Sequence, residues 1–442
     1  MTISSMHPGG RRPWLRRVAV AATTMCLGLA ATACSGSDAP TAGKGPAKSE
    51  SGPVTISYAI WEKPQLATMQ KIAAKFHEEN PNITVNLQLT PWEQYWTKLQ
   101  TSLKGGSAAD VFWMNIPNLK KYANGGVLMP IDDYVARDKV DLNNYVPAVM
   151  DAYKFKDHVY ALPKDVDSIA LWYNKDLFKQ AGVAFPTADW TWDDLTAAAQ
   201  KLTNPSKGVY GIAAAAEDQA NYDNTILQAG GSILSPDGKK SGLDSPEAIR
   251  GLRLWVDLIN KHHASPTLQQ MTDTDPEQMF TSGKVAMYYG GSWTVLDMKA
   301  VPEARKFADV APMPHDAQRY SVSNGLGMVI NGKTKHPDAA WQWVKFLGGK
   351  TAAQIQAETG AVIPAYKGMT DAWVKSSPEF HLQAFVDQLQ YAKPLPASID
   401  TPAWRDATAA ELAKAWAGTV SVEQAAAKAA AIMNGALARE GS

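Results

Sequence analysis

Apolar and polar residues alternate in two stretches near the start of the folded chain, 54–61 and 83–89, and a third run, 110–114, is mostly apolar. Between these runs, residues 64–80 and 91–104 repeat apolar positions every three or four residues, as amphipathic helices do. The order strand, helix, strand, helix, strand predicts a parallel sheet with right-handed crossovers. Ligands bind beyond the carboxyl ends of the strands in such sheets. The residues that follow each strand are therefore the first candidates for a binding site.

Indole, carboxylate and amide side chains follow the three predicted strands. Trp61 and Glu62 end the first strand, and Asn115 ends the third. Trp92 follows the second strand, with Tyr95 just inside the next helix. A single tryptophan is more often a core residue, but several at one rim favour a surface that stacks on a ligand. We expect these five residues to contact a ligand.

A polar island, residues 164–168, lies between two apolar runs, and the second run, 169–173, has the composition of a buried strand. Polar residues between two core segments mark a loop that turns or touches a ligand. We expect the chain to cross here between two lobes, with Asp165 and Asp167 facing the ligand. Asp165 could equally hold the backbone of the crossing, and the sequence does not separate these two roles.

Predicted strands that end in polar and aromatic residues also occur in the second half of the chain. We expect strands over 209–215 and 284–289, each followed by polar and aromatic residues at a strand end. Strand-like runs over 310–314 and 320–330 flank a polar bridge, 315–319, which is a candidate second crossing between the lobes. The candidate contacts at these strand ends are Tyr222, Gly291, Ser292 and Trp293.

The N-terminus has the pattern of an export signal. Arg11, Arg12, Arg16 and Arg17 precede an apolar run, 18–33, that is shorter than the ~20 residues a spanning helix needs. The paired arginines belong either to a twin-arginine signal or to a general secretion signal, and both alternatives stay open. We expect the protein to be exported.

Small residues before Cys34 resemble a bacterial lipobox, in which this cysteine becomes the lipidated first residue of the mature chain. Residues 35–53 contain no aliphatic residue larger than alanine and indicate a flexible tether. We therefore expect a protein that is held by a lipid on the outer face of the cytoplasmic membrane, at a cell surface or in a periplasm.

The composition excludes several classes of function. Without the signal the chain has 39 basic and 43 acidic residues, and no basic patch suggests nucleic acid. The only two cysteines, Cys26 and Cys34, lie in the signal and at the lipid site, so no disulfide or cysteine metal site is expected. We expect no metal and no cofactor. The length from Val54 onward exceeds one core and predicts at least two domains or lobes.

Several short motifs carry a family resemblance when they are taken together in order. The chain resembles the sugar-type extracellular solute-binding proteins of ABC importers, the maltose-binding-protein class, from Val54 to its end. The motifs are Tyr160-Ala161-Leu162-Pro163, Leu171-Trp172-Tyr173-Asn174-Lys175-Asp176-Leu177-Phe178, Trp190-Thr191-Trp192-Asp193-Asp194-Leu195, Phe280-Thr281-Ser282-Gly283-Lys284-Val285-Ala286-Met287 with Gly291-Ser292-Trp293, Asn324-Gly325-Leu326-Gly327, and Ala339-Ala340-Trp341.

The resemblance implies a two-lobe α/β fold that closes about hinge segments on a ligand. Residues 54–165 and 320–368 would form the first lobe, and 166–319 and 369–442 the second. It implies delivery of a mono- or oligosaccharide to permease subunits by a protein that is a monomer and not an enzyme. By similarity and by hydrogen-bonding chemistry, the expected contacts are Trp61, Glu62, Trp92, Tyr95, Asn115, Asp165, Asp167, Tyr222, Gly291, Ser292, Trp293, Asn324, Trp404 and Arg405.

Two other classes of function stay open at this stage. The protein could bind a non-sugar solute such as a polyol, a polyamine or a peptide. It could also be a secreted glycoside hydrolase with Glu62 and Asp167 as its carboxylate pair. Met114 stands where some relatives place a stacking tryptophan, which argues against a maltodextrin ligand.

Overall fold

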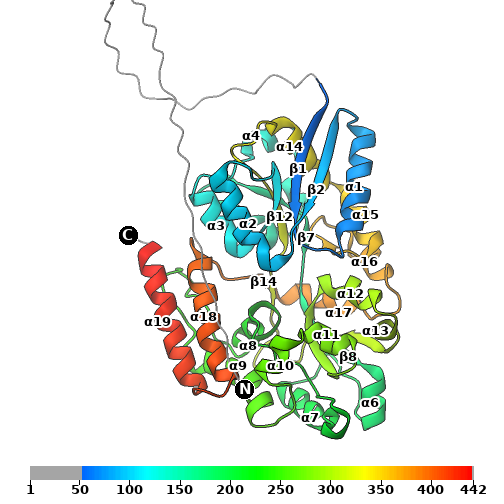
Figure 1. Ribbon diagram of the computed structural model, residues 1–442, viewed down its shortest axis with the longest axis vertical. Helices are drawn as coiled ribbons and strands as arrows, with labels where there is room; N and C mark the ends of the chain where they lie inside the picture. The colour runs from blue at the N-terminus through cyan, green and yellow to red at the C-terminus, as the bar shows by residue number, and fades with distance from the viewer. Residues whose placement is uncertain (1–51, 441–442) are drawn as a thin grey trace, which may run out of the picture. The chain divides into compact units, whose positions relative to one another are not determined.

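The computed structural model of the protein describes residues 52–440, in which helices and strands alternate (Figure 1). This arrangement confirms the predicted α/β class. The signal segment, the lipid site at Cys34 and nearly all of the tether lie outside the described residues. No helix within 52–440 has the length and apolar character needed to cross a membrane.

A five-stranded sheet forms the centre of the first lobe. Its strands are, in spatial order, β2 (Ile83–Leu89), β1 (Val54–Ile60), β3 (Val111–Asn115), β12 (Leu326–Ile330) and β6 (Ala161–Pro163). Strand β1 pairs in parallel with β2 and β3, as the sequence predicts. Strand β12 joins from late in the chain and runs antiparallel to β3 and β6. The carboxyl ends of β1, β2 and β3 therefore meet at one edge of the sheet.

Helices cover this sheet and position the segments that follow its strands. Helix α1 (Leu66–Glu79) contacts β2, α3 (Ile116–Asn124) contacts β3, and α14 (Pro337–Leu347) contacts β12 and β1. The remaining elements of this part are α2 (Trp92–Gly105), α4 (Asp132–Arg137), η1 (Leu142–Asn144), α5 (Pro147–Ala152), the hairpin β4 (Lys154–Phe155) and β5 (His158–Val159), and α15 (Lys350–Thr359).

A smaller antiparallel sheet forms the centre of the second lobe. Strand β8 (Ile169–Asn174) lies between β10 (Ala308–Ala311) and β9 (Met287–Gly291). Around it lie α6 (Lys175–Ala181), α7 (Trp192–Leu202), η2 (Pro205–Lys207), η3 (Asp218–Tyr222), α8 (Asp223–Gln228), α9 (Pro246–Asn260), α10 (Leu268–Asp273), α11 (Pro276–Thr281), η4 (Ser292–Thr294), α12 (Val295–Ala300) and α13 (Pro302–Phe307).

The prediction of a strand over 209–215 is wrong. Residues 209–215 are buried or partly buried, as their apolar character suggested, but they form only isolated bridges such as Tyr210 with Val285. Gly211 also packs so closely on α7 that an added Cβ would lie 1.9 Å from the Ala199 carbonyl oxygen. The segment is therefore an extended core loop. The strand expected over 284–289 does form, but it starts later, at Met287.

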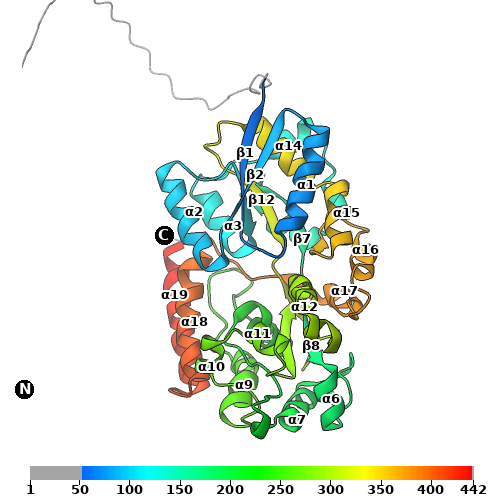
Figure 2. The same ribbon diagram turned by 45° about the vertical axis from the view of Figure 1, so that its right-hand side comes forward.

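The C-terminal part of the chain is mostly helical. Its elements are α16 (Thr370–Lys375), α17 (Gln383–Gln388), η5 (Leu389–Tyr391), β14 (Ala392–Pro394), α18 (Thr401–Trp416) and α19 (Val422–Glu440). Helices α18 and α19 lie side by side in both views (Figures 1 and 2). They contact α9 of the second lobe, and α18 also contacts α3 of the first.

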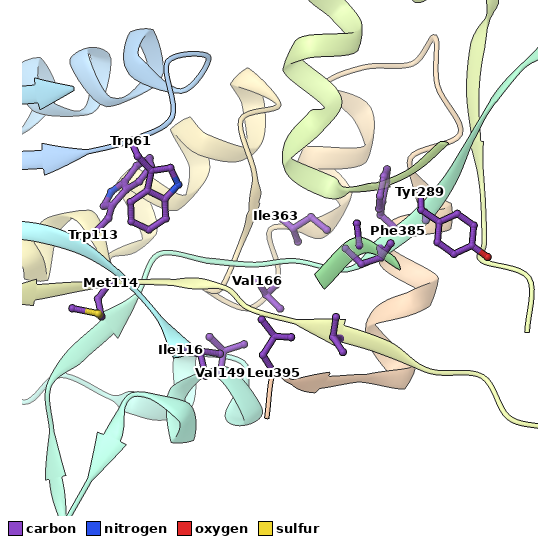
Figure 3. Close-up of a cluster of buried hydrophobic side chains, with 14 of the residues drawn as sticks. Trp61, Trp113, Met114, Ile116, Val149, Val166, Tyr289, Ile363, Phe385 and Leu395 are labelled. Atoms are coloured by element: carbon purple, nitrogen blue, oxygen red, sulfur yellow. The ribbon is translucent and has the colours of Figure 1, made fainter. Parts of the chain in front are cut away.

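Several chain segments run between the two sheets. The first, β7 (Asp165–Val166), pairs with β13 (Ile363–Pro364). Another, β11 (Ser321–Ser323), pairs in parallel with β14. Figure 3 shows Val166 and Ile363 between Trp113 of the first lobe and Phe385 of the second, so apolar packing continues through the crossings.

The second crossing does not coincide with the polar bridge 315–319. His315 N–H donates to the Trp190 carbonyl and Gln318 N–H to the Gln228 carbonyl, so the bridge stays on the second lobe. The run 320–330, expected as one strand, instead breaks at Asn324 and Gly325, where Gly325 has a φ of 58°. The chain therefore crosses at this break, which the apolar pattern did not reveal.

Candidate functional site

A cavity of about 710 Å³ lies where the two lobes face each other. Its wall includes residues after β1 and at the start of α2 from the first lobe, and the segment 215–221 from the second. The rest of the wall comes from the crossings at β7 and at Asn324, from Leu326 and Val362, from α10 and the start of α11, from the end of β9, and from one residue of α18. Eight of the fourteen predicted contacts line this cavity: Trp61, Glu62, Trp92, Asp165, Asp167, Ser292, Trp293 and Asn324.

Indoles form the apolar part of the wall. Trp61 is buried and packs against Trp92, Tyr95 and Trp113 with ring centroids 4.8–5.3 Å apart. Trp92, by contrast, is 45% exposed, although it is a large apolar side chain. The buried ring therefore supports the exposed one, and Trp92 offers a free face to the cavity.

A second indole, Trp293, reaches the cavity from the end of β9. Its position depends on Gly291, because a Cβ added there would lie 1.9 Å from a carbon of the Trp293 ring. Gly291 itself is buried and is not among the lining residues. The glycine thus shapes the wall by letting the neighbouring ring pack over its backbone.

Asp165 holds the crossing together and also lines the cavity. Its Oδ2 accepts from Lys164 Nζ at 2.5 Å, and its Oδ1 accepts from Leu326 N–H at 2.6 Å. The Lys164 side chain is fully buried, donates to Gln65 Oε1 and lies 4.7 Å from the centroid of the Trp113 ring. The two roles proposed for Asp165 are therefore not exclusive.

Asp167 joins the first crossing to the second. Its carboxylate accepts from the backbone N–H groups of Asn324 at 2.7 Å and Gly325 at 3.2 Å, and from Gln219 Nε2 at 3.3 Å. Burial raises the pKa of Asp167 to about 6, against the effect of these hydrogen bonds. The same carboxylate therefore links two crossings to the segment that forms the opposite wall.

Glu62 occupies the first-lobe wall and is only partly buried. Burial, together with repulsion from Asp297 of the second lobe, raises its pKa to about 7, while Lys164 opposes the shift. This carboxyl group is therefore partly protonated at pH 7 and can donate a hydrogen bond to a ligand as well as accept one.

Six predicted contacts do not line the cavity. Tyr95, Asn115, Tyr222 and Trp404 are buried, with at most 4% of each residue exposed. Tyr95 donates to the Trp113 carbonyl, Asn115 caps α3 through Asn118, and Trp404 Nε1 donates to Ser398 Oγ. The other two are Gly291, described above, and Arg405.

Arg405 forms ion pairs instead of facing the cavity. Its guanidinium binds Asp218 and the fully buried Asp223, with 13% of the arginine side chain exposed. Burial and the nearby Asp218 raise the pKa of Asp223, while Arg405 opposes this shift. Arg405 thereby fixes α18 against the start of α8.

Several polar lining residues were not predicted. Most lie within a few residues of a predicted contact, whereas Thr272 and Asp275 lie near none. The former are Gln65 before α1, Glu217, Asp218, Gln219 and Asn221 beside Tyr222, Tyr288 on β9, and Asp406 beside Arg405. The polar composition of 217–222 was a usable signal. The π-helical turn over Asp218–Tyr222 then turns Tyr222 inward and leaves the polar residues on the wall.

Comparison with known proteins identifies the family. The family described as bacterial extracellular solute-binding protein matches residues 61–354, which is more than half of the chain. The chain belongs to this family. Members are extracellular binding proteins of importers, so the protein is exported.

Relatives of this solute-binding protein include sugar-binding proteins. A maltotriose-binding protein from Pyrococcus abyssi is 25% identical over 77% of this chain and 73% of that protein. An ABC substrate-binding protein from Listeria monocytogenes, solved in complex with cycloalternan, is 28% identical with a TM-score of 0.83, covering 87% of this chain and 99% of the other. An ABC transporter solute-binding protein from Thermotoga lettingae, bound with α-D-tagatose, is 25% identical with a TM-score of 0.78 and coverages of 87% and 99%.

These neighbours confirm the predicted two-lobe solute-binding fold, and they are binding proteins and not enzymes. Within residues 52–440, no group of three or more His, Cys, Asp or Glu side chains is arranged to hold a metal ion.

Proposed function

We propose that this solute-binding protein captures a mono- or oligosaccharide in the cavity between its lobes and delivers it to the permease of an ABC importer. The observation that carries the proposal is one exposed indole, Trp92, facing a wall of carboxylate and amide groups. An indole covers the C–H face of a pyranose, and carboxylates accept from its hydroxyl groups. Such charge-assisted bonds contribute about 1.5–3 kcal/mol each.

The ligands of relatives support a carbohydrate. The similar proteins named above include one described as binding maltotriose and structures holding cycloalternan or tagatose. These ligands differ in size and linkage, so they support the class of ligand and not one sugar. Met114, which is fully buried here, gives no stacking surface for a maltodextrin at that position.

Capture occurs by bending at the crossings. Because the chain crosses at Asn324 and Gly325 and not at the expected boundary before residue 320, we assign 54–165 with 326–368 to one moving lobe and 166–323 with 369–442 to the other. The carboxylates of Asp165 and Asp167 lie at the pivot and also line the cavity, so a ligand that binds them favours one hinge geometry. Closure would exclude the water that competes for sugar hydroxyls.

In the proposed cellular arrangement the protein acts as a monomer that is anchored through a lipid on Cys34. The lipobox-like sequence before Cys34 and the tether that follows support this part of the proposal. A lipid on Cys34 would keep the binding lobes near a membrane permease.

A thermal-shift screen tests the proposed function. Purified protein is heated with a panel of mono- and oligosaccharides, and with polyols, polyamines and peptides as competing classes. Because a ligand that binds only the folded state stabilises it, a sugar ligand should raise the melting temperature in proportion to the logarithm of its concentration. A rise with polyamines or peptides and none with any sugar would contradict the proposal. Unchanged sugar recovered after incubation separates binding from hydrolysis.

A further inference from the structure

Carboxylates dominate the charge of the cavity wall. Glu62, Asp165 and Asp167 line it from the first lobe and the crossing. The second-lobe side and α18 add Glu217, Asp218, Asp275 and Asp406. Among residues 52–440, no lysine or arginine lines the cavity. This imbalance is local, since the described chain as a whole is nearly neutral.

Nearby cations neutralise only two of these seven carboxylates. Lys164 pairs with Asp165, and Arg405 pairs with Asp218 and with Asp223 behind it. Within the described part of the chain, Glu62, Glu217, Asp275 and Asp406 form no salt bridge. The empty cavity therefore keeps more carboxyl groups than cations, although burial raises the pKa of Glu62 to about 7 and raises that of Glu217 as well, so these two are partly protonated at pH 7.

Carboxyl groups of one lobe also affect the pKa of carboxyl groups of the other lobe. Burial, together with repulsion from Asp297, Asp275 and Glu62, raises the pKa of Glu277 to about 8. Glu62 belongs to the first lobe and the other three to the second, so carboxyl groups of the two lobes repel each other when they are ionised. Closing the lobes on a neutral ligand would strengthen this repulsion, whereas a cation between the walls would reverse it.

A second observation on the same wall is an amide group without a hydrogen-bond partner. Asn221 lines the cavity and is 98% buried, and its Nδ2 has no hydrogen-bond partner within the described structure. A buried amide donor without a partner is costly, and a ligand hydroxyl oxygen would satisfy it once a small movement of the side chain turns Nδ2 toward the cavity. Asn221 lies on the same turn as Asp218, so a donor to a hydroxyl group stands beside acceptors for a cation.

We propose that the sugar bound here carries a free ammonium group, as an amino sugar or an oligosaccharide containing one, held between Glu62 and the second-lobe carboxylates. This inference rests on the proposed sugar-binding function. An ammonium has three donors and no acceptor, which matches a wall rich in acceptors, while Trp92 and Asn221 suit the ring and its hydroxyl groups. The indoles and the free amide donor favour an amino sugar over a simple polyamine.

Calorimetric titration at pH 7 tests this inference with matched probes. The probes are glucosamine, N-acetylglucosamine and glucose, each as the monosaccharide and as the β-1,4-linked disaccharide. We expect the amino forms to bind at least about tenfold more tightly than their acetylated and neutral counterparts, because their hydrogen bonds are charge-assisted. Raising the salt concentration should reduce this preference.

A charge-removing variant sharpens the test. Glu62→Gln keeps the shape of the side chain, and we expect it to remove most of the preference for the amino form. Glu303→Gln is the control, because Glu303 is 74% exposed on α13 and pairs only with Lys306. A neutral sugar that binds as tightly as its amino form would overturn this inference and leave sugar binding standing. Binding of none of the six probes, with a response to polyamines, would overturn both.

Discussion

At the residue scale, the predicted contacts divide according to how firmly the backbone sets their direction. Trp61 and Glu62 directly follow β1, Trp92 lies shortly after β2, and the edge of a parallel sheet brings these residues to the cavity wall. Tyr222 and Trp404 lie within helical turns, where a shift of one or two residues changes the side that faces the cavity. The sequence predicts the neighbourhood of such contacts, while packing decides the individual residue.

Trp92 should contribute more to ligand affinity than to the stability of the fold. We expect Trp92→Ala to weaken sugar binding by at least about tenfold, because the exposed ring loses its stacking face. The free energy of unfolding should fall by only about 1–2 kcal/mol, which the ring contacts of Trp92 with Trp61 and Trp96 contribute. Calorimetry and urea denaturation measure the two quantities.

Phe185→Ala provides the matched control, because Phe185 is the other large apolar side chain that is well exposed in residues 52–440, at 37%. It lies outside the cavity wall. Equal losses of affinity in both variants, or none in either, would show that Trp92 does not stack on the ligand.

Gly291 should affect the affinity for sugar only through the position of the Trp293 ring. Gly291→Ala adds a Cβ that collides with the Trp293 ring, so we expect the ring to turn away and the affinity for sugar to fall several-fold or more. In a double-mutant cycle, adding Gly291→Ala to Trp293→Ala should cost little further affinity. Gly105→Ala, with no atom nearer than 3.8 Å to the new Cβ, is the control. Additive losses of affinity in the double variant would show that the two residues act independently and would contradict this prediction.

At the element scale, periodicity predicts regular elements well and irregular ones poorly. The helices predicted over 64–80 and 91–104 form as α1 and α2, with ends that differ by one or two residues. The run 209–215 has the composition of a strand but no neighbouring strand to pair with, so it packs as a loop. The second crossing also escaped prediction, because its position depends on backbone bonds to Asp167.

The first crossing depends on the buried pair of Lys164 and Asp165. We expect Lys164→Met to lower the free energy of unfolding by about 3–5 kcal/mol, because it leaves the Asp165 carboxylate buried without its cation. Chemical denaturation measures the change. Lys154→Met is the control, since that lysine is 46% exposed in its pair with Asp151 and should cost less than about 1 kcal/mol. Equal effects would mean that the buried pair does not hold the crossing.

At the scale of the whole molecule, length and rhythm predict two lobes, and the family comparison agrees. The charge of the cavity, in contrast, could not be predicted from the sequence. A chain with near-zero net charge gives no sign that its acidic residues converge on one wall, because they come from segments far apart in the sequence. Only the folded arrangement reveals the acidic cavity.

The raised carboxyl pKa values predict how stability depends on pH. Burial raises the pKa of Glu62 to about 7, of Glu277 to about 8, and of Asp297 to about 6. Each group then binds its proton more tightly in the folded state, so stability falls as pH rises from about 5 to 8. We expect the free energy of unfolding to be at least about 1 kcal/mol larger at pH 5.5 than at pH 8. Urea denaturation showing equal or greater stability at pH 8 would contradict this.

Capture by closure is the central claim, and small-angle X-ray scattering tests it most directly. The radius of gyration is measured for the purified protein alone and with a saturating amount of the sugar that gives the largest thermal shift. We predict a smaller radius with the sugar, because the lobes bend at the crossings and close on it. Calorimetrically saturated binding with an unchanged radius of gyration would contradict the account.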